Sequence, residues 1–222
     1  MAVTATPSLS ALDVMSDAPV IPVIVLHDVQ HAVPMAEALV AGGIRMLEVT
    51  LRTPQALACI EAIARSVPQA VAGAGTVRSV ADANAAAQAG ARFAVSPGYT
   101  SAVGSACRAK GLPLLPGVAT GSEIMMAHAD GFEELKFFPA MQAGGVAMLK
   151  AWQGPFGDVR FCPTGGISPA NAADFLALAN VACVGGSWLV PSEALAARDW
   201  ARITQLARAA AQLPRVWGQM GR

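Results

Sequence analysis

A lysine inside an apolar segment is the strongest chemical signal in this chain. Lys136 lies in the run 135–140 (Leu-Lys-Phe-Phe-Pro-Ala), which predicts a buried strand, whereas Lys110 and Lys150 lie in helix-like contexts. An ammonium group among apolar side chains is costly unless it is paired or gives up its proton. Because a neutral amine is a nucleophile for carbonyl groups, the segment indicates Schiff-base chemistry.

A second interpretation of Lys136 stays open from this segment alone. The side chain would point outward between helices, or would pair with the neighbouring Glu133 or Glu134, and the lysine would have no chemical role. The rest of the chain has to distinguish the two interpretations.

An acidic residue lies within another apolar strand, predicted at residues 46–50. Alternation along the strand puts Glu48 and Thr50 on one face, and a carboxylate there is costly to leave unpaired. We expect Glu48 to face inward, across from Lys136. Arg52 follows the strand, where a planar guanidinium can grip a carboxylate with two hydrogen bonds.

Glycine-rich ends of four strands mark where a ligand can approach the backbone. The run 72–76 (Ala-Gly-Ala-Gly-Thr) ends with a hydroxyl at Thr76, and the run 96–98 (Ser-Pro-Gly) is a rigid turn. Ordinary turn chemistry is the alternative for these two. Paired glycines also follow the last two strands, in the runs 163–169 and 185–188. The alternative there is two tight turns that need positive φ, but both loops together favour a phosphate site made of backbone amides.

Strands and helices alternate along the whole chain, which predicts a parallel α/β fold. Eight such units in 222 residues predict a closed (β/α)8 TIM barrel at about 18–212, with an extra N-terminal helix at about 8–17 and a single domain over 1–222. A doubly wound sheet would need a glycine fingerprint after its first strand, and residues 26–30 contain no glycine. The expected strands are 20–26, 46–50, 70–74, 93–96, 114–117, 135–138, 160–162 and 181–185. The expected helices are 31–41, 54–65, 79–89, 100–110, 121–129, 145–152, 169–178 and 198–212.

The composition excludes several classes of protein. The formal net charge is zero with no basic run, which argues against nucleic acid as a partner. Hydrophobic residues make up 54% of the chain and charged residues 14%, which indicates a covered sheet, a subunit interface or both. No apolar segment has the length of a membrane span, the start of the chain lacks the basic region of a secretory signal, and the four cysteines lack CxxC spacing. We therefore expect a cytoplasmic protein with reduced thiols, and the three histidines show no metal-ligand pattern.

Six segments together resemble the bacterial 2-keto-3-deoxy-6-phosphogluconate (KDPG) aldolases, which are also described as 4-hydroxy-2-oxoglutarate (KHG) aldolases. The resemblance covers residues from about 18 to about 212, in the same order and spacing. The segments are 47–52, 73–76, 96–98, 136–140, 162–167 and 185–188.

The resemblance implies a class I aldolase of the Entner–Doudoroff pathway that is usually a homotrimer and needs neither metal nor cofactor. Its substrate would be a phosphorylated keto acid, cleaved to pyruvate and glyceraldehyde 3-phosphate, with 4-hydroxy-2-oxoglutarate cleaved to pyruvate and glyoxylate as a second reaction. It implies Lys136 as the Schiff-base lysine and Glu48 as the general acid and base. The implied substrate contacts are Arg52 and Thr76 for the pyruvate carboxylate, Pro97 and Phe138 for the pocket wall, Thr164 for the hydroxyl region, and Gly165, Gly166, Gly186 and Ser187 for the phosphate.

Three other functions remain as alternatives. The nearest is an aldolase of the same family for the phosphogalactonate epimer or for an unphosphorylated substrate. A lysine-independent phosphate-binding barrel, such as an isomerase or synthase, would keep the glycine loops but have no use for a buried lysine facing Glu48. A phosphosugar-binding protein without catalysis is the third. Tyr99 and the loop 141–154 are less typical of the family and have no role assigned from the sequence.

Overall fold

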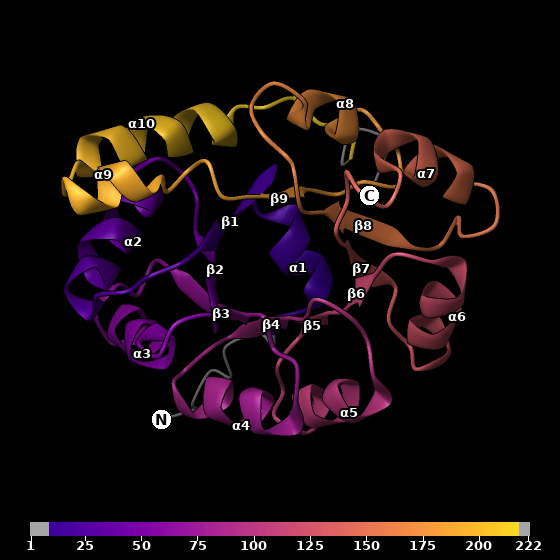
Figure 1. Cartoon of the computed structure of the whole chain (residues 1–222), viewed down its shortest axis with the longest axis horizontal. Coiled ribbons are helices and arrows are strands. Elements are labelled where there is room, and N and C mark those ends of the chain that lie inside the picture. The colour runs from indigo at the N-terminus through magenta and orange to yellow at the C-terminus, as the bar shows by residue number, and fades with distance from the viewer. Residues whose placement is uncertain (1–8, 218–222) are drawn as a thin grey trace, which may run out of the picture.

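Parallel strands form the centre of the protein, and helices surround them (Figure 1). The structure is a computed structural model that describes residues 9–217. The strands are β1 (Val20–Ile24), β2 (Met46–Thr50), β3 (Val71–Gly75), β4 (Phe93–Val95), β5 (Leu114–Leu115), β6 (Gly117–Val118), β7 (Glu134–Phe137), β8 (Arg160–Pro163) and β9 (Val184–Gly186). The helices are α1 (Ala11–Ser16), η1 (Val29–His31, a 3-10 turn), α2 (Ala32–Ala41), α3 (Ala56–Ser66), α4 (Val80–Gln88), α5 (Ser101–Ala109), α6 (Gly121–Ala129), α7 (Gly145–Trp152), α8 (Ala172–Leu176), α9 (Ser192–Ala196) and α10 (Trp200–Ala211).

The strands belong to two sheets, so the prediction of one closed (β/α)8 barrel is wrong. Within residues 9–217 a half-barrel of six strands has the order β5-β4-β3-β2-β1-β9, and a second sheet has the order β6-β7-β8. The expected strand 114–117 is interrupted at Pro116, which has no N–H to donate to a ladder. On the other side, the last strand begins at Val184 rather than at residue 181. Two isolated bridges, Phe161 with Val181 and Thr164 with Gly185, link the segment 181–186 to the segment of β8.

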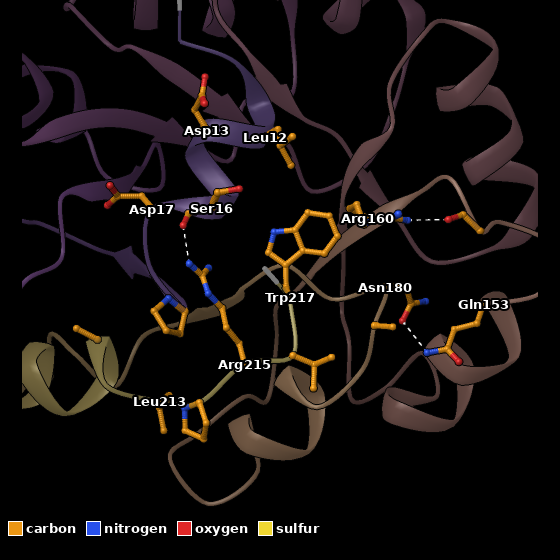
Figure 2. A pocket seen from close by; sticks show the side chains of 16 residues that line it. Leu12, Asp13, Ser16, Asp17, Gln153, Arg160, Asn180, Leu213, Arg215 and Trp217 are labelled. Atoms are coloured by element: carbon orange, nitrogen blue, oxygen red, sulfur yellow. Dashed lines mark hydrogen bonds between the residues drawn. The ribbon is translucent and has the colours of Figure 1, made fainter. Parts of the chain in front are cut away.

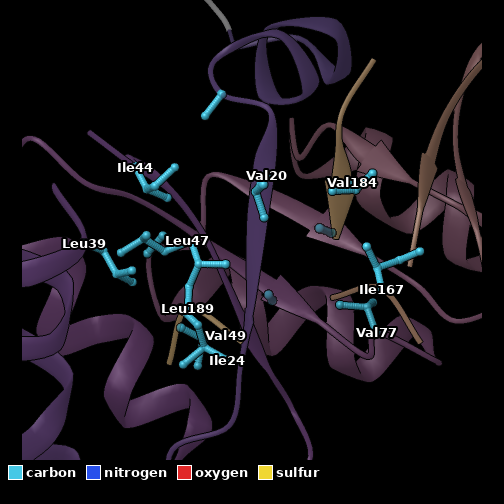
Figure 3. Packing of buried hydrophobic residues seen from close by; sticks show 14 of the residues in the cluster. Val20, Ile24, Leu39, Ile44, Leu47, Val49, Val77, Ile167, Val184 and Leu189 are labelled. Carbon is cyan, nitrogen blue, oxygen red and sulfur yellow. The ribbon is translucent and has the colours of Figure 1, made fainter. Parts of the chain in front are cut away.

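The buried side chains form two clusters that separate the two faces of the strands. The outer cluster lies between strands and helices, and Figure 3 shows part of it, with Leu47 and Val49 of β2 beside Ile24 of β1. The inner cluster lies between the strands and α1, which occupies the centre of the view in Figure 1. Because Met46 belongs to the inner cluster, alternation turns Glu48 to the inner face as well. The inner cluster consists of Val14, Met15, Ile21, Met46, Phe93, Val95, Leu115, Cys162, Ala182 and Cys183.

The N-terminal end of the interior is covered by α1 and by the C-terminal segment. The helix begins with a capping box in which Ser10 Oγ accepts from the Asp13 N–H and the Asp13 carboxylate accepts from the Ser10 N–H. Arg215 donates from Nη1 to the carbonyl oxygens of Met15, Ala18 and Ala182, and from Nη2 to that of Ser16. The N-terminal end of the strands is therefore filled by structural contacts. The C-terminal end is the one available to a ligand. Within residues 9–217 no helix combines the length and the apolar character that crossing a membrane requires.

Tyr99, which had no role from the sequence, ties the loop after β4 to the end of α6. Its hydroxyl donates to the Asp130 carboxylate, which also accepts from Ser101 Oγ at 2.6 Å. Arg108 Nη2 donates to the Asp130 carbonyl oxygen at 2.7 Å, and the Tyr99 ring meets the Phe132 ring edge-on at 5.4 Å between centroids. Burial, followed by the hydrogen bond to Asp130, raises the pKa of Tyr99 to about 12.

Alkaline titration tests this contact, because Tyr99 is the chain's one tyrosine and its ultraviolet absorbance reports a single site. We expect the phenol to stay neutral through pH 10 and to ionise near pH 12. The raised pKa means that the contact's contribution to stability is present below about pH 10 and is lost as the pH rises through about 12. Asp130→Asn should lower the pH at which half of the Tyr99 phenol is ionised. The Asp130 carboxylate accepts a hydrogen bond from the neutral phenol and repels the phenolate. Half-ionisation near pH 10 in the folded protein would contradict this account.

Candidate active site

A lysine and a glutamate meet inside the protein, from strands on opposite sides of it. Lys136 Nζ of β7 lies 3.3 Å from Glu48 Oε1 of β2. The two residues are 6% and 3% exposed, and no other charged residue among positions 9–217 is buried. The neighbours of Lys136 in the strand, Leu135 and Phe137, belong to the outer cluster, so the lysine faces the interior. An outward-pointing Lys136, or one paired with Glu133 or Glu134, is not what the structure shows.

The contact between this amine and this carboxylate is suited to proton transfer. Each buried charge would be costly alone, and each offsets the desolvation of the other. The amine must be neutral to attack a carbonyl carbon, and Glu48 lies within hydrogen-bond distance to accept its proton. Lys136 Nζ also lies 5.2 Å from the centroid of the Phe138 ring, which forms an apolar wall on that side.

Gly75 provides the space that the Glu48 side chain occupies. A β-carbon on Gly75 would collide with Oε1 of Glu48 and lie 2.7 Å from its Cγ. Residues 48 and 73 are paired in the ladder between β2 and β3, so Gly75 lies one inward position beyond the glutamate. The glycines of this run were expected to admit a ligand, and the structure shows that Gly75 admits a side chain of the protein itself.

Arg52 and Thr76 lie at the ends of β2 and β3, at the same edge of the half-barrel. Arg52 is exposed, and its Nε donates to Thr50 Oγ1 at 3.1 Å. Thr76 has a φ of 61°, a left-handed conformation that is uncommon for a β-branched residue. Such strain persists where the surrounding structure fixes it, and it is concentrated at functional sites. Thr50 had no predicted role, although its alternation with Glu48 is a signal that the sequence already contained.

The loop after β8 and the strand β9 use glycine for different reasons. Gly165 and Gly166 have φ values of 102° and 76°, a backbone conformation that side chains disfavour, so bare backbone follows β8. Gly185 and Gly186 have no positive φ; a β-carbon there would collide with Thr164 and with the Trp188 ring, respectively. The alternative of two turns that need positive φ therefore applies only to the first pair.

The remaining predicted residues lie near this end of the strands. Thr164 is 6% exposed and follows β8 directly, while Ser187 is exposed just after β9. The backbone of Pro97 lies so close to Gly117 that a β-carbon there would collide with it. In residues 9–217 no group of three or more His, Cys, Asp or Glu residues has the arrangement of a metal site.

A separate cavity of about 1360 Å³ lies at the other end of the strands (Figure 2). Its lining includes Asp13 and Ser16 of α1, Arg160 at the start of β8, and Arg215 and Trp217 of the C-terminal segment. Arg160 Nη1 donates to the carbonyl oxygens of two nearby residues, and its guanidinium carbon lies 5.1 Å from the Trp217 ring. None of the predicted site residues lines this cavity. It lies at the N-terminal end of the strands, which α1 and Arg215 cover.

Comparison with known proteins gives the family. Residues 12–206 match the family model described as KDPG and KHG aldolase. The chain belongs to the KDPG and KHG aldolase family. It is 55% identical over 203 residues to the KHG/KDPG aldolase of Escherichia coli strain K12, which covers 91% of this chain and 95% of the relative. It is 54% identical over 202 residues to the 2-dehydro-3-deoxy-phosphogluconate aldolase of Pseudoalteromonas atlantica, covering 91% of this chain and 94% of the relative.

A solved structure of the same family gives a further comparison. The KDPG aldolase of Legionella pneumophila, with pyruvate captured as a covalent carbinolamine intermediate, has a TM-score of 0.90 and 48% identity. The match covers 92% of this chain and 99% of that one. Members of this family are aldolases, so the chain is an aldolase, a carbon–carbon lyase.

Replacing Gly75 tests whether the position of Glu48 matters. The β-carbon of Gly75→Ala would push the carboxylate away from Lys136, and we expect aldol turnover to fall at least about tenfold because proton transfer needs hydrogen-bond distance. Gly154→Ala is the matched control, because a β-carbon there meets nothing within 4 Å and should leave turnover unchanged. Equal turnover in both variants, with both folded, would show that the space at Gly75 is not needed.

Proposed function

We propose that this chain is a class I aldolase that forms a Schiff base between Lys136 and 2-keto-3-deoxy-6-phosphogluconate. Its products are pyruvate and glyceraldehyde 3-phosphate, and it also cleaves 4-hydroxy-2-oxoglutarate to pyruvate and glyoxylate. The observation that carries the proposal is the buried amine of Lys136, 3.3 Å from the buried carboxylate of Glu48. The Legionella relative with pyruvate captured as a carbinolamine supports the same chemistry.

The reaction begins with the loss of a proton from Lys136 to Glu48. The neutral Nζ attacks the C2 carbonyl carbon of the substrate, and one proton moves from this nitrogen to the oxygen, which gives a neutral carbinolamine. Glu48 returns a proton to this hydroxyl, which leaves as water and yields a cationic imine. The positive nitrogen then withdraws electrons from the carbon chain, which prepares the C3–C4 bond for cleavage.

Cleavage and release reuse the same carboxylate. Glu48 takes the proton of the C4 hydroxyl, the C3–C4 electron pair moves toward the iminium nitrogen, and the aldehyde leaves while an enamine remains on Lys136. Glu48 then gives this proton to C3, which restores the cationic imine. Attack of water on C2 then releases pyruvate and leaves Lys136 as an ammonium group beside the Glu48 carboxylate, so protons and electrons balance over the cycle.

The residues around the pair take the substrate's other groups in this proposal. Arg52 and Thr76 bind the carboxylate of the pyruvate half, because a guanidinium and a hydroxyl are suitable donors to it. Pro97 and Phe138 form the pocket wall and Thr164 contacts the hydroxyl region. The phosphate is bound by the backbone at Gly165, Gly166, Gly186 and Ser187, and the positive φ of the first two glycines supports this by keeping the backbone bare.

We further propose that the chain is a single-domain subunit of a homotrimer and acts in the cytoplasm. The family match spans residues 12–206 in one piece, which supports a single domain. Met125 and Met126 of α6 are 65% and 53% exposed and would be available to a subunit contact. All four cysteines are free, as is typical of proteins in a reducing compartment. The mass of the particle in solution tests the assembly.

Turnover of defined substrates tests the function. We expect the protein to cleave the gluconate-derived substrate, with pyruvate measured through lactate dehydrogenase. Lys136→Ala should abolish cleavage because the covalent intermediate cannot form, whereas Lys110→Ala and Lys150→Ala, at exposed lysines, should retain it. Full activity of Lys136→Ala would disprove the mechanism. Faster cleavage of the galactonate-derived epimer would instead assign the enzyme to that substrate.

Replacing Glu48, the proposed acid and base, separates the role of its carboxylate from that of the Lys136 amine. Glu48→Gln keeps the size of the side chain and removes proton transfer, so we predict a fall in turnover of about 10²–10⁴. Imine formation with pyruvate should slow but still occur, because Lys136 remains. Glu61→Gln, at a partly exposed glutamate of α3 that pairs with Arg65, serves as the control for a change of one charge far from Lys136. A variant at position 48 that turns over at the normal rate would remove Glu48 from the mechanism.

A further inference from the structure

We propose that Thr50 is a positioning residue for Arg52, and that it decides which edge of the guanidinium is presented to the substrate carboxylate. Thr50 ends β2, two residues after Glu48, and is 1% exposed. Its Oγ1 lies 2.8 Å from the Ile24 carbonyl oxygen and 3.1 Å from Arg52 Nε. The inference rests on the proposed function, in which Arg52 binds that carboxylate.

The direction of the two hydrogen bonds follows from the chemistry of the groups. A carbonyl oxygen can only accept, so the single hydroxyl proton of Thr50 goes to Ile24. An arginine Nε–H can only donate, so it donates to the lone pairs that remain on Thr50 Oγ1. Arg52 is thereby linked through Thr50 to the backbone of β1, the neighbouring strand.

The hydrogen bond to Thr50 determines which edge of the Arg52 guanidinium can bind a ligand. A guanidinium binds a carboxylate with two parallel bonds, either from Nε and one Nη or from both Nη atoms. Because Nε is occupied by Thr50, the end-on pair of Nη1 and Nη2 is the one left for a ligand. Arg52 is exposed, and without this bond its long side chain would sample many rotamers before binding.

Valine and serine at position 50 separate the hydroxyl from the shape of the side chain. Thr50→Val keeps the branched shape and removes both hydrogen bonds, while Thr50→Ser keeps the hydroxyl. For Thr50→Val we expect the pyruvate concentration that gives half-maximal borohydride trapping, and the KM of the keto acid, to rise about tenfold, as expected for one hydrogen bond to a charged group. The trapping yield at saturating pyruvate and kcat should change much less, and Thr50→Ser should lie close to the unmodified protein.

A double-mutant cycle with Arg52→Ala distinguishes positioning from a merely structural effect. Thr50→Val also leaves the Ile24 carbonyl without its partner, which would weaken the contact between β1 and β2 whether or not Arg52 is present. If Thr50 acts through Arg52, the tenfold effect on half-saturation disappears in the Arg52→Ala background. An equal effect in both backgrounds, or none in either, overturns the proposal. Thermal melting of each variant shows that the comparison is between folded proteins.

Calorimetric binding of pyruvate, without borohydride, makes the failure of the two proposals distinguishable. In one outcome no imine is trapped, but pyruvate binding is weakened by Thr50→Val and retained by Thr50→Ser. This would disprove the Schiff-base function and support the role of Thr50. Normal imine trapping with the same pyruvate affinity in all three proteins would keep the function and disprove the role of Thr50. Absence of both trapping and binding would reject both.

Discussion

Two opposite charges, Lys136 and Glu48, lie in contact in an interior that holds no other buried charge within residues 9–217, and the rest of the structure is arranged around keeping them there. Neither group would be stable in that place alone, because a buried charge without a partner costs several kcal/mol. Their contact joins β7 of the small sheet to β2 of the half-barrel, so it also links the two sheets across the interior. The absence of a side chain at Gly75 is what gives the carboxylate its place. One contact therefore serves both the packing and the proposed chemistry.

The two ends of the strands have different tasks. At the N-terminal end, α1 and Arg215 close the interior with a capping box and hydrogen bonds to backbone carbonyls. At the C-terminal end lie the exposed Arg52, the strained Thr76 and the bare backbone of Gly165. Strain and exposure are tolerated at that end because the inner and outer clusters supply the stability elsewhere. Parallel strands with their carboxyl ends together make this separation possible.

Much of the site could be predicted from the sequence, and what could not has identifiable physical causes. A charged residue within an apolar strand can be recognised from the sequence alone. Because such a charge is costly without a partner, the sequence predicts that Lys136 and Glu48 face each other. Whether the strands close into one barrel could not be predicted from the sequence. It depends on whether Pro116 interrupts one ladder and on where the last strand begins. The contacts of Thr50 and Tyr99 are not visible in the sequence, because each depends on a partner far away in the chain, a backbone carbonyl for Thr50 and a carboxylate for Tyr99. The buried charged pair was thus easier to predict than the arrangement of the two sheets around it.

The most direct measurement of the central claim is peptide mapping by mass spectrometry after borohydride reduction in the presence of pyruvate. The chain has three lysines, so the modified position can be assigned without ambiguity. The account predicts one carboxyethyl group per chain, on the peptide that contains Lys136, and none on the peptides of Lys110 and Lys150. Labelling of an exposed lysine with Lys136 untouched, or no labelling at saturating pyruvate, would contradict it.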